Sequence, residues 1–327
     1  MRASNDPRMT METLLLDREQ VLSCLSFEDA VSVIEEAFAA FGRGEAAMPA
    51  KVYLDIPEVG GDFRAMPARC GKYAGIKWVA SHPENPTVRG LPQIIAVFIL
   101  NDPLTALPLA IMDGTALTER RTGAAAAIAS KYLASASKKM GFLGCGIQAQ
   151  AILNAHRVVF GEDLEILAAD RDEAAAARFA ERNGGRVVSI EEIGKVDILN
   201  TTTPSRTPLI EADQLLPHTH INAIGADAPG KRELDASVLD GLRIVVDDVH
   251  QASHSGEINV PLTEGILEPS AILGNLGQIV AGLVDGRRGE GRSLFDSTGL
   301  AIQDVVAAAK AYENAKERGI GQTSRIV

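Results

Sequence analysis

The chain has 327 residues, of which 46% are hydrophobic and 23% charged, and its formal net charge is −11. This composition is typical of a globular protein and excludes disordered and fibrous classes, while the negative charge disfavours a nucleic-acid partner, whose phosphates it would repel. No apolar stretch reaches the roughly 18 residues of a membrane span and the first residues lack a signal-peptide core, so we expect a cytoplasmic protein without membrane association.

The first part of the chain predicts one helix and several short strands. Residues 1–10 are polar and poorly patterned, and we expect a frayed extension or a mis-called start there, before a strand-like run over 11–16. Ser26 precedes apolar residues with helical spacing up to Phe41, and Gly42 ends the pattern, which predicts a helix lying on a core. Runs over 52–56, 76–80, 94–100 and 109–112 predict an antiparallel or mixed sheet.

From Lys139 onward the pattern changes to alternating strands and helices. Strands are predicted over 140–143, 164–169, 187–189, 198–201, 220–224 and 244–246, and this alternation indicates an α/β fold with a parallel, doubly wound sheet. A long amphipathic helix is predicted over 300–316, after Gly299, and we expect it to fold back onto the first part of the chain. Because a chain of this length exceeds one hydrophobic core, we expect two domains.

A glycine-rich turn joins the first strand of the alternating part to a helical pattern. In Gly144-Cys145-Gly146, Gly144 allows a tight turn and Gly146 lets the backbone approach a pyrophosphate, whose charge then lies at the helix N-terminus. Asp170, 24 residues after Gly146, ends the next strand, where an acid accepts hydrogen bonds from the adenosine ribose. The carboxylate repels a 2′-phosphate and favours NAD over NADP, although Arg171 can contact a phosphate. The alternative is an ordinary strand-turn-helix connection.

The cysteines and one histidine pair give no metal or disulfide signal. Cys24, Cys70 and Cys145 are far apart and follow no Cys-x-x-Cys spacing, so we interpret them as reduced, buried thiols. His250 and His254 have the spacing of helical metal ligands, but the surrounding Gly and Ser residues disfavour zinc.

Several other segments resemble the ornithine cyclodeaminase and mu-crystallin family, most closely its archaeal-type alanine dehydrogenases. They are residues 48–54, 63–68, 75–79 with 81–86, 121–125, 222–234 and 295–301, and the resemblance extends from Met11 to the C-terminus. It implies a Rossmann NAD-binding domain over 127–298 and an α+β substrate-binding and dimerisation domain formed by 1–126 and 299–327. It further implies a homodimer that oxidatively deaminates L-alanine to pyruvate and ammonia with NAD, reversibly.

Four cations lie in or beside apolar segments, where an unpaired charge is costly: Lys51, Arg64, Lys77 and Arg121. A bound carboxylate would explain them, and the alternative is that each reaches water or pairs with a nearby acid. The resemblance implies that Lys51 and Arg64 hold the substrate carboxylate, that Lys77 transfers protons, and that Arg121 lies near both substrate and cofactor. A lysine that is surrounded by other cations and partly desolvated has a lowered pKa, so Lys77 could take a proton from a substrate ammonium.

The resemblance assigns the remaining site residues as well. Asp227 would face the substrate nitrogen and assist water, although its segment is also rich in turn-forming residues. Thr298 would contact the substrate, while Gln93 departs from the family threonine that approaches the cofactor, and His82 is interpreted as a turn residue. Further cofactor contacts would come from Gly144, Gly146, Ile147, Gln148, Asp170, Arg171, Thr202, Thr203, Gly225, Lys231 and Ser297, together with Arg121.

Three other functions remain open at this point. Ornithine cyclodeamination would give proline and ammonia and leave NAD unchanged overall, and its product distinguishes it from alanine oxidation. A cyclic ketimine reductase usually uses NADPH, which Asp170 disfavours. A non-catalytic binding protein would retain the cofactor fold without turnover, and the presence of Lys77 and Asp227 argues against it.

Overall fold

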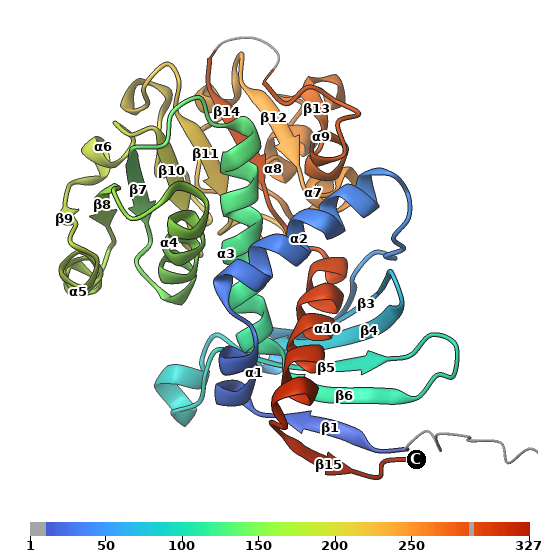
Figure 1. Ribbon diagram of the computed structural model, residues 1–327. Helices are drawn as coiled ribbons and strands as arrows, with labels where there is room; N and C mark the ends of the chain where they lie inside the picture. Colours follow the sequence, from blue (N-terminus) through green and yellow to red (C-terminus); the bar gives the residue numbers. More distant parts are fainter. Residues whose placement is uncertain (1–10, 288–290) are drawn as a thin grey trace, which may run out of the picture.

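The computed structural model describes residues 11–287 and 291–327, and it contains two β-sheets connected by long helices (Figure 1). The extension expected over residues 1–10 lies outside the described residues. Within those two ranges, no helix has both the length and the apolar character needed to cross a bilayer.

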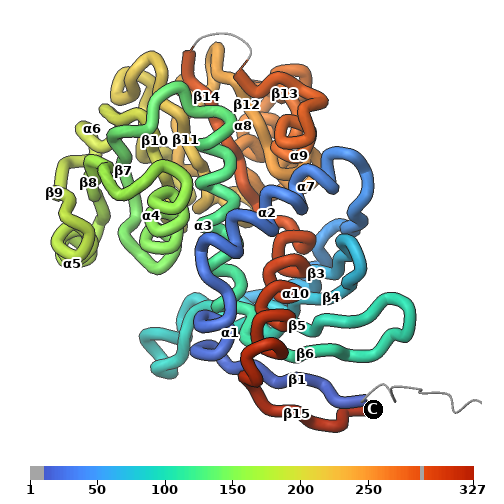
Figure 2. The backbone as a smooth tube through the Cα atoms, in the orientation of Figure 1, coloured from blue at the N-terminus to red at the C-terminus, as the bar shows by residue number. Residues whose placement is uncertain are grey.

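The first sheet has seven strands in the order β15-β1-β6-β5-β4-β3-β2. β1 runs parallel to β6 and antiparallel to β15, and the other neighbours are antiparallel, which confirms the mixed sheet. The β1–β15 pair brings the two ends of the described chain together (Figure 2). The strands are β1 (Thr13–Leu16), β2 (Val52–Ile56), β3 (Gly61–Cys70), β4 (Tyr73–Ser81), β5 (Ile94–Asn101), β6 (Pro108–Asp113) and β15 (Gln322–Ser324).

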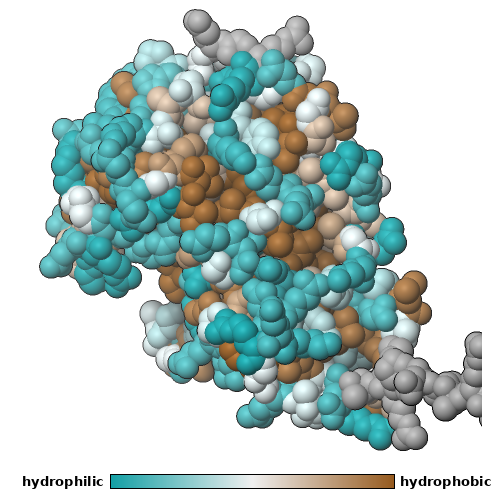
Figure 3. Space-filling view, viewed as in Figure 1, coloured by the Kyte–Doolittle hydropathy of each residue, from teal (hydrophilic) through white to brown (hydrophobic). Residues whose placement is uncertain are grey.

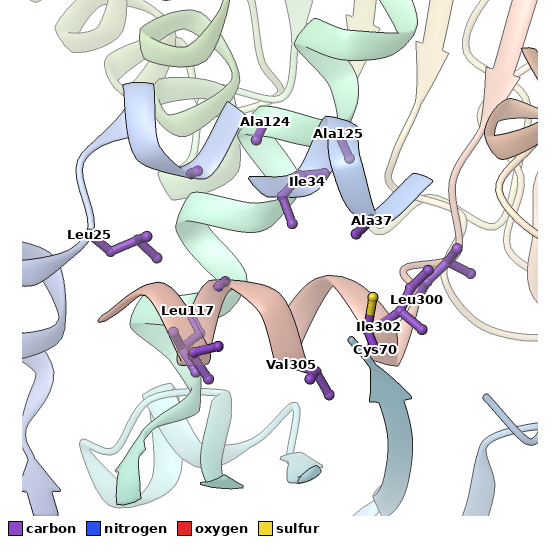
Figure 4. Close-up of a cluster of buried hydrophobic side chains, with 14 of the residues drawn as sticks. Leu25, Ile34, Ala37, Cys70, Leu117, Ala124, Ala125, Leu300, Ile302 and Val305 are labelled. Atoms are coloured by element: carbon purple, nitrogen blue, oxygen red, sulfur yellow. The ribbon is translucent and has the colours of Figure 1, made fainter. Parts of the chain in front are cut away.

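Helices lie over one face of this sheet, where α1, α3 and α10 contact the strands and α2 packs on α3 and α10. They are α1 (Arg18–Cys24), α2 (Phe27–Gly42), α3 (Gly114–Leu133) and α10 (Ala301–Arg318), and α10 crosses over the strands in Figure 1. Ser26 caps α2 by accepting a hydrogen bond from the Asp29 N–H, as the sequence predicts. Buried side chains of α2, α3 and α10 meet in one apolar cluster, which includes Ile34, Ala124 and Val305 (Figure 4). The return of the last helix to the first sheet is therefore confirmed.

The second sheet has eight strands in the order β13-β12-β14-β11-β10-β7-β8-β9, and every neighbouring pair is parallel. This confirms the doubly wound α/β prediction. Its strands are β7 (Lys139–Leu143), β8 (Glu165–Ala169), β9 (Arg186–Val187), β10 (Ile198–Thr201), β11 (His220–Ala223), β12 (Arg243–Val246), β13 (Ile272–Asn275) and β14 (Ser293–Asp296).

Apolar clusters lie on both faces of the second sheet. Hydrophilic side chains cover the surface over α5 and α6, and hydrophobic ones gather towards the middle of the molecule (Figure 3). The helices of this part are α4 (Ile147–Phe160), α5 (Glu173–Asn183), α6 (Ile190–Ile193), α7 (Val249–Ser255), α8 (Asn259–Thr263) and α9 (Leu276–Val280). Short helical turns in the two parts are η1 (Pro57–Val59), η2 (Asn85–Arg89), η3 (Ala212–Gln214), η4 (Ala236–Leu239) and η5 (Pro269–Ala271).

The chain reverses direction across the second sheet between β7 and β10. From β7 the next strand, β8, lies on one side, whereas β10 lies on the other. In open parallel sheets such a switch point is where ligands bind, beyond the carboxyl ends of the strands. The segments that follow β7, β10, β11, β12 and β14 all emerge at this edge, because their strands are parallel.

Two expectations need correction, on the strands and on Cys145. The sequence pattern did not predict β3, β13, β14 or β15, and β9 ends at Val187 rather than Ser189. Cys24 and Cys70 are buried free thiols, but Cys145 is only partly buried. The division into domains at residues 126 and 298 stays a prediction.

Candidate active site

The glycine-rich turn lies between β7 and α4 and is open in front of the helix. Gly144 has φ +90°, and a Cβ there would lie 2.9 Å from Thr202 Oγ1, so the position needs glycine. Gly146 is the N-cap of α4 and makes no side-chain cap, and a Cβ on it would meet nothing within 4 Å. Gln148 Oε1 is buried without a hydrogen-bond partner among the described residues. These features fit a dinucleotide whose phosphates would meet the free N–H groups of the helix.

Asp170 follows β8 and faces this turn. Its Oδ2 accepts a hydrogen bond from Cys145 N at 2.7 Å, and its Oδ1 accepts one from Asp172 N at 2.9 Å. The side chain of Arg171 is exposed, as is that of Ile147 at the start of α4. Burial and the Asp170 charge raise the pKa of the Cys145 thiol to about 12, so this cysteine stays protonated near neutral pH.

A buried glutamate organises the two loops beside the turn. Glu233 Oε1 accepts a hydrogen bond from Thr203 N at 2.6 Å, and Oε2 accepts from Gly225 N at 3.1 Å and Thr201 Oγ1 at 2.7 Å. Thr202 Oγ1 donates to the Gly144 carbonyl at 2.9 Å. The predicted cofactor residues Thr202, Thr203 and Gly225 therefore lie together at the switch point.

Another buried acid, Asp247, holds the turn after β14. Its Oδ2 accepts hydrogen bonds from Thr298 N at 2.7 Å and Gly299 N at 2.6 Å, and its Oδ1 accepts one from Thr298 Oγ1 at 3.0 Å. Ser297 Oγ lies 3.4 Å from Oδ2. Lys51 Nζ donates to the Thr298 carbonyl at 2.5 Å, which connects the first part of the chain to this turn.

Lys77 and Arg121 share one buried carboxylate. Lys77 Nζ donates to Asp304 Oδ1 at 3.0 Å and to Thr118 Oγ1 at 3.2 Å, and Arg121 Nε donates to the same Oδ1 at 3.3 Å. A Cβ at Gly299, whose φ is +82°, would lie 2.8 Å from Arg121 Nη1, so glycine lets the guanidinium reach this turn.

The pKa of Lys77 is lowered from 10.5 to about 8. Burial is the largest cause, and Arg121 and Lys51 add to it, while Asp304 opposes it. Burial likewise lowers the pKa of Lys51 to about 8, against the charges of Asp247 and Asp227. Lys77 is thus a buried amine whose pKa lies near 8, with burial rather than the neighbouring cations as the largest cause.

Arg64 and Lys231 flank Asp227. Arg64 makes a two-point contact with Asp62, through Nε at 2.7 Å and Nη2 at 3.0 Å, and its Nη1 lies 3.4 Å from Asp227 Oδ2. Lys231 Nζ donates to Asp227 Oδ1 at 2.6 Å. Burial raises the pKa of Asp227, but Lys231 and Arg64 outweigh it, so the pKa is lowered from 3.8 and the group is a carboxylate at neutral pH.

Three of the four cations have acids of the chain itself to compensate for their burial, and Lys51 donates to a backbone carbonyl. Arg64, Lys77 and Arg121 have carboxylate partners, and only the partner of Arg64 is near in sequence. The structure joins these cations with Asp227, Lys231 and the 297–299 turn, whereas none of the described contacts joins Asp170 or Arg171 to them. The residue roles stay predictions.

Sequence reasoning missed the acids of this site: Asp62, Glu233, Asp247 and Asp304. Asp304 had a usable signal, because it is an acid on the buried face of an amphipathic helix. Asp247 and Glu233 lie in irregular segments, where the sequence shows no helical or strand periodicity that would distinguish a buried acid from a surface acid.

Comparisons with known proteins find relatives over nearly the whole chain. The model of the ornithine cyclodeaminase/mu-crystallin family matches residues 11–319. A relative from Archaeoglobus fulgidus, an alanine dehydrogenase, is 48% identical over 318 residues, covering 95% of this chain and 98% of the relative.

Two solved structures have the same fold over nearly the whole chain. An archaeal alanine dehydrogenase dimer with bound NAD gives a TM-score of 0.94 at 48% identity, covering 97% of this chain and 100% of the other. The Thermococcus litoralis Δ1-pyrroline-2-carboxylate reductase in complex with NADH and L-proline gives 0.89 at 34% identity, covering 95% and 99%.

Proposed function

The chain belongs to the ornithine cyclodeaminase/mu-crystallin family, and on that premise we propose that it is an NAD-dependent alanine dehydrogenase. The observation that carries the proposal is the buried Lys77 amine, with a pKa of about 8, beside Arg121 and Lys51. These groups lie at the edge of the sheet where the glycine-rich turn and the open end of α4 fit a dinucleotide. The 48% identity to the Archaeoglobus fulgidus alanine dehydrogenase supports alanine as the substrate.

The cations would bind and orient the substrate. Arg64 keeps its Nε–Nη2 edge on Asp62, so a substrate carboxylate would bind on its Nη1 side, beside the long 3.4 Å contact with Asp227. Lys51 and Arg121 add positive charge on the side of the 297–299 turn. Holding the carboxylate in this way fixes the position of Cα, which supplies much of the rate in such reactions.

Lys77 and Asp227 would handle the protons. Lys77 as the neutral amine takes a proton from the alanine ammonium, because hydride loss from Cα requires a neutral substrate nitrogen. Bound NAD⁺ supplies the acceptor for that hydride. Asp227 accepts a proton from the water that adds to the resulting iminopyruvate, after which the C–N bond breaks and ammonia leaves. The balance is alanine, NAD⁺ and water to pyruvate, ammonium, NADH and a proton.

The test is the absorbance of NADH with purified protein and four substrate sets. We expect NADH formation with L-alanine and NADH consumption with pyruvate plus ammonium. Proline formed from ornithine without net NADH, or NADH consumed by a cyclic imine alone, would replace alanine with one of the other family reactions. In Lys77→Ala we expect about a 10²- to 10⁴-fold lower kcat with NADH binding retained, whereas equal turnover would contradict the role of Lys77.

We also propose a homodimer that forms through the uncovered face of the first sheet. Val52, Leu54, Trp78, Ile95 and Val97 lie on β2, β4 and β5 and are each about half exposed, and the Trp78 ring stacks on Phe63 at 5.2 Å. Adjacent strands thus present a continuous apolar surface, which monomers rarely expose. The archaeal alanine dehydrogenase of the same fold is a dimer, which supports a second copy as the occupant.

A cytoplasmic location completes the proposal. The reaction needs the NAD pool, and all three cysteines are free thiols, which suits a reducing compartment. Fractionation of cells with a tagged protein tests it, and recovery outside the cytoplasmic fraction would contradict it.

A further inference from the structure

Asp304 lies where three elements meet. It is in the first turn of α10, its side chain is fully buried, and it contacts Lys77 on β4 and Arg121 on α3. We propose that Asp304 is a positioning residue, which holds the Lys77 amine and the Arg121 guanidinium in the arrangement that proton transfer and carboxylate binding require. The inference rests on the proposed function for the reaction that it serves.

The hydrogen bonds of Lys77 support this assignment. An ammonium has three N–H groups, and two of them are directed at Asp304 Oδ1 and Thr118 Oγ1. Thr118 donates its own proton to the Gly114 carbonyl at 2.8 Å, so its oxygen is an acceptor for Lys77. Because both oxygens of Asp304 lie on the same side of the amine, one N–H direction remains for a substrate nitrogen, and Asp304 and Thr118 determine where it points.

Asp304 is also poised to keep Lys77 and Arg121 close together. Two like charges in a buried site repel, and a shared carboxylate oxygen compensates for this repulsion. The other oxygen, Asp304 Oδ2, lies 2.8 Å from Lys77 Nζ in an ion pair, but the angle is not that of a hydrogen bond, and no other described residue donates to it. That oxygen is a buried acceptor beside the reacting amine.

The charges that face Lys77 come from three elements. They are Asp304 on α10, Arg121 on α3 and Lys51 in the segment before β2, and Asp304 is the one that favours the ammonium form. Removing the Asp304 charge leaves burial and two cations acting on Lys77. The pKa of Lys77 should then fall further, whereas a residue that only stabilises α10 would leave it unchanged.

The experiment compares kcat/KM for alanine oxidation between pH 6 and 10 in wild type and Asp304→Asn. The acid limb of the profile reports the loss of the Lys77 proton. In Asp304→Asn we expect this limb to move about 1–3 units to lower pH, as for loss of a close opposite charge. We expect the plateau to fall about 10- to 100-fold through misplacement of Lys77 and Arg121. A folded Asp304→Asn protein with an unmoved limb would overturn the proposal.

Two further variants complete the design. Glu313 lies on the exposed side of α10 and accepts a hydrogen bond from the Tyr73 hydroxyl. Glu313→Gln removes this charge from the same helix and should give the same pH profile as wild type. Asp304→Glu keeps the charge but moves it by one methylene, so we expect an unmoved acid limb and a lower plateau. If Asp304→Asn does not fold, Asp304→Glu decides, and a wild-type plateau in that variant would overturn the positioning role.

A measurement without substrate separates this inference from the proposed function. In protein labelled with [ε-13C]lysine, the shift of the Lys77 signal, assigned by its loss in Lys77→Arg, reports ionisation directly. A wild type without alanine turnover would refute the proposed function, but a lower Lys77 pKa in Asp304→Asn would still support this inference. Equal Lys77 pKa values in the two proteins would overturn it, whatever the kinetic assay shows.

Discussion

Asp170 presents both carboxylate oxygens to backbone N–H groups of Cys145 and Asp172. The side chain is therefore held at the end of β8 before any ribose arrives, and its charge stays on the side of the glycine-rich turn. A preformed acid of this kind discriminates against a 2′-phosphate mainly by repulsion, because its hydrogen-bond acceptors alone would tolerate either cofactor.

Asp170→Asn should lower the preference for NAD over NADP by about tenfold, which is one charge repulsion of about 1.4 kcal/mol. The amide oxygen can still accept from the Cys145 N–H, while the exposed Asp172 N–H can turn to water, so the turn should keep its shape and KM for NAD should rise only a few-fold. The measurement is kcat/KM with each cofactor at saturating alanine. An unchanged ratio would show that the Asp170 charge does not select the cofactor.

The buried carboxyl of Asp296, at the end of β14, should make the free energy of unfolding depend on pH between about 4 and 7. Burial raises its pKa from 3.8 to about 7, and Asp247 nearby adds to the rise. Between these values the folded protein holds a proton that the unfolded chain has lost, so the free energy of unfolding decreases with increasing pH. Asp296→Asn should flatten this decrease by an amount of the order of 1–4 kcal/mol between pH 4 and 8.

Urea unfolding at several pH values measures the effect. Glu36→Gln, an exposed acid on α2, is the control and should reproduce the wild-type slope. A slope in Asp296→Asn equal to that of wild type would mean that Asp296 is not protonated in the folded state.

Local pattern and family resemblance sufficed to select Lys77, Arg64 and Asp227, but not their partners. Asp304 is 227 residues away from Lys77 along the chain, so no sequence spacing relates the two. Burial of a cation is visible in a sequence, whereas the identity of the acid that compensates for it depends on tertiary packing.

Among the elements, the loops after β10 and β11 depend on one side chain for their shape. Glu233 is fully buried and accepts hydrogen bonds from both loops, while its own N–H and that of Leu234 donate to Glu257. Glu233 therefore fixes the backbone of the two loops, and Glu257 fixes the backbone of the segment that carries Glu233.

Glu233→Gln should destabilise the protein by about 1–3 kcal/mol and weaken NADH binding several-fold. Both carboxylate oxygens accept from a backbone N–H, so the amide NH2 of glutamine must face Thr203 N or Gly225 N and leave it unsatisfied. Urea unfolding and NADH fluorescence titration measure the two effects. Glu264→Gln, an exposed acid after α8, is the control, and equal values in both variants would contradict the role of Glu233.

Sequence reasoning missed β3, β13, β14 and β15, and for two of these strands a reason can be read from their residues. β3 contains Arg64, Pro67 and Arg69, which obscure its alternation, and β14 has only four residues before Ser297. The strands of the parallel sheet with apolar cores were predicted well, because burial on both faces leaves a clear apolar run. In β3, charged residues and a proline thus interrupt the alternation of apolar and polar side chains by which a strand is recognised.

For the whole molecule, the apolar face of the first sheet predicts the assembly. Val97 lies in the middle of that face, 43% exposed and paired with Trp78 on the neighbouring strand. Val97→Asp would place a charge in the proposed interface, where its desolvation is costly, so we expect dissociation to monomers at micromolar concentration.

Sedimentation velocity of wild type and variant checks this expectation. Val187→Asp provides a matched control, since Val187 is 48% exposed on β9 at the edge of the other sheet. A monomeric wild type would refute the dimer, and a dimeric Val97→Asp protein would place its interface elsewhere.

The return of α10 to the first sheet has a consequence for the order of events on the ribosome. All strands of the second sheet are complete once residue 296 has emerged, whereas the first sheet waits for α10 and β15. Until then Lys77 and Arg121 lack the carboxylate that they share, and the helices α2 and α3 lack the apolar face of α10. In a growing chain, the nucleotide-binding half is therefore expected to fold before the half that begins at the N-terminus, and the reacting amine acquires its surroundings last.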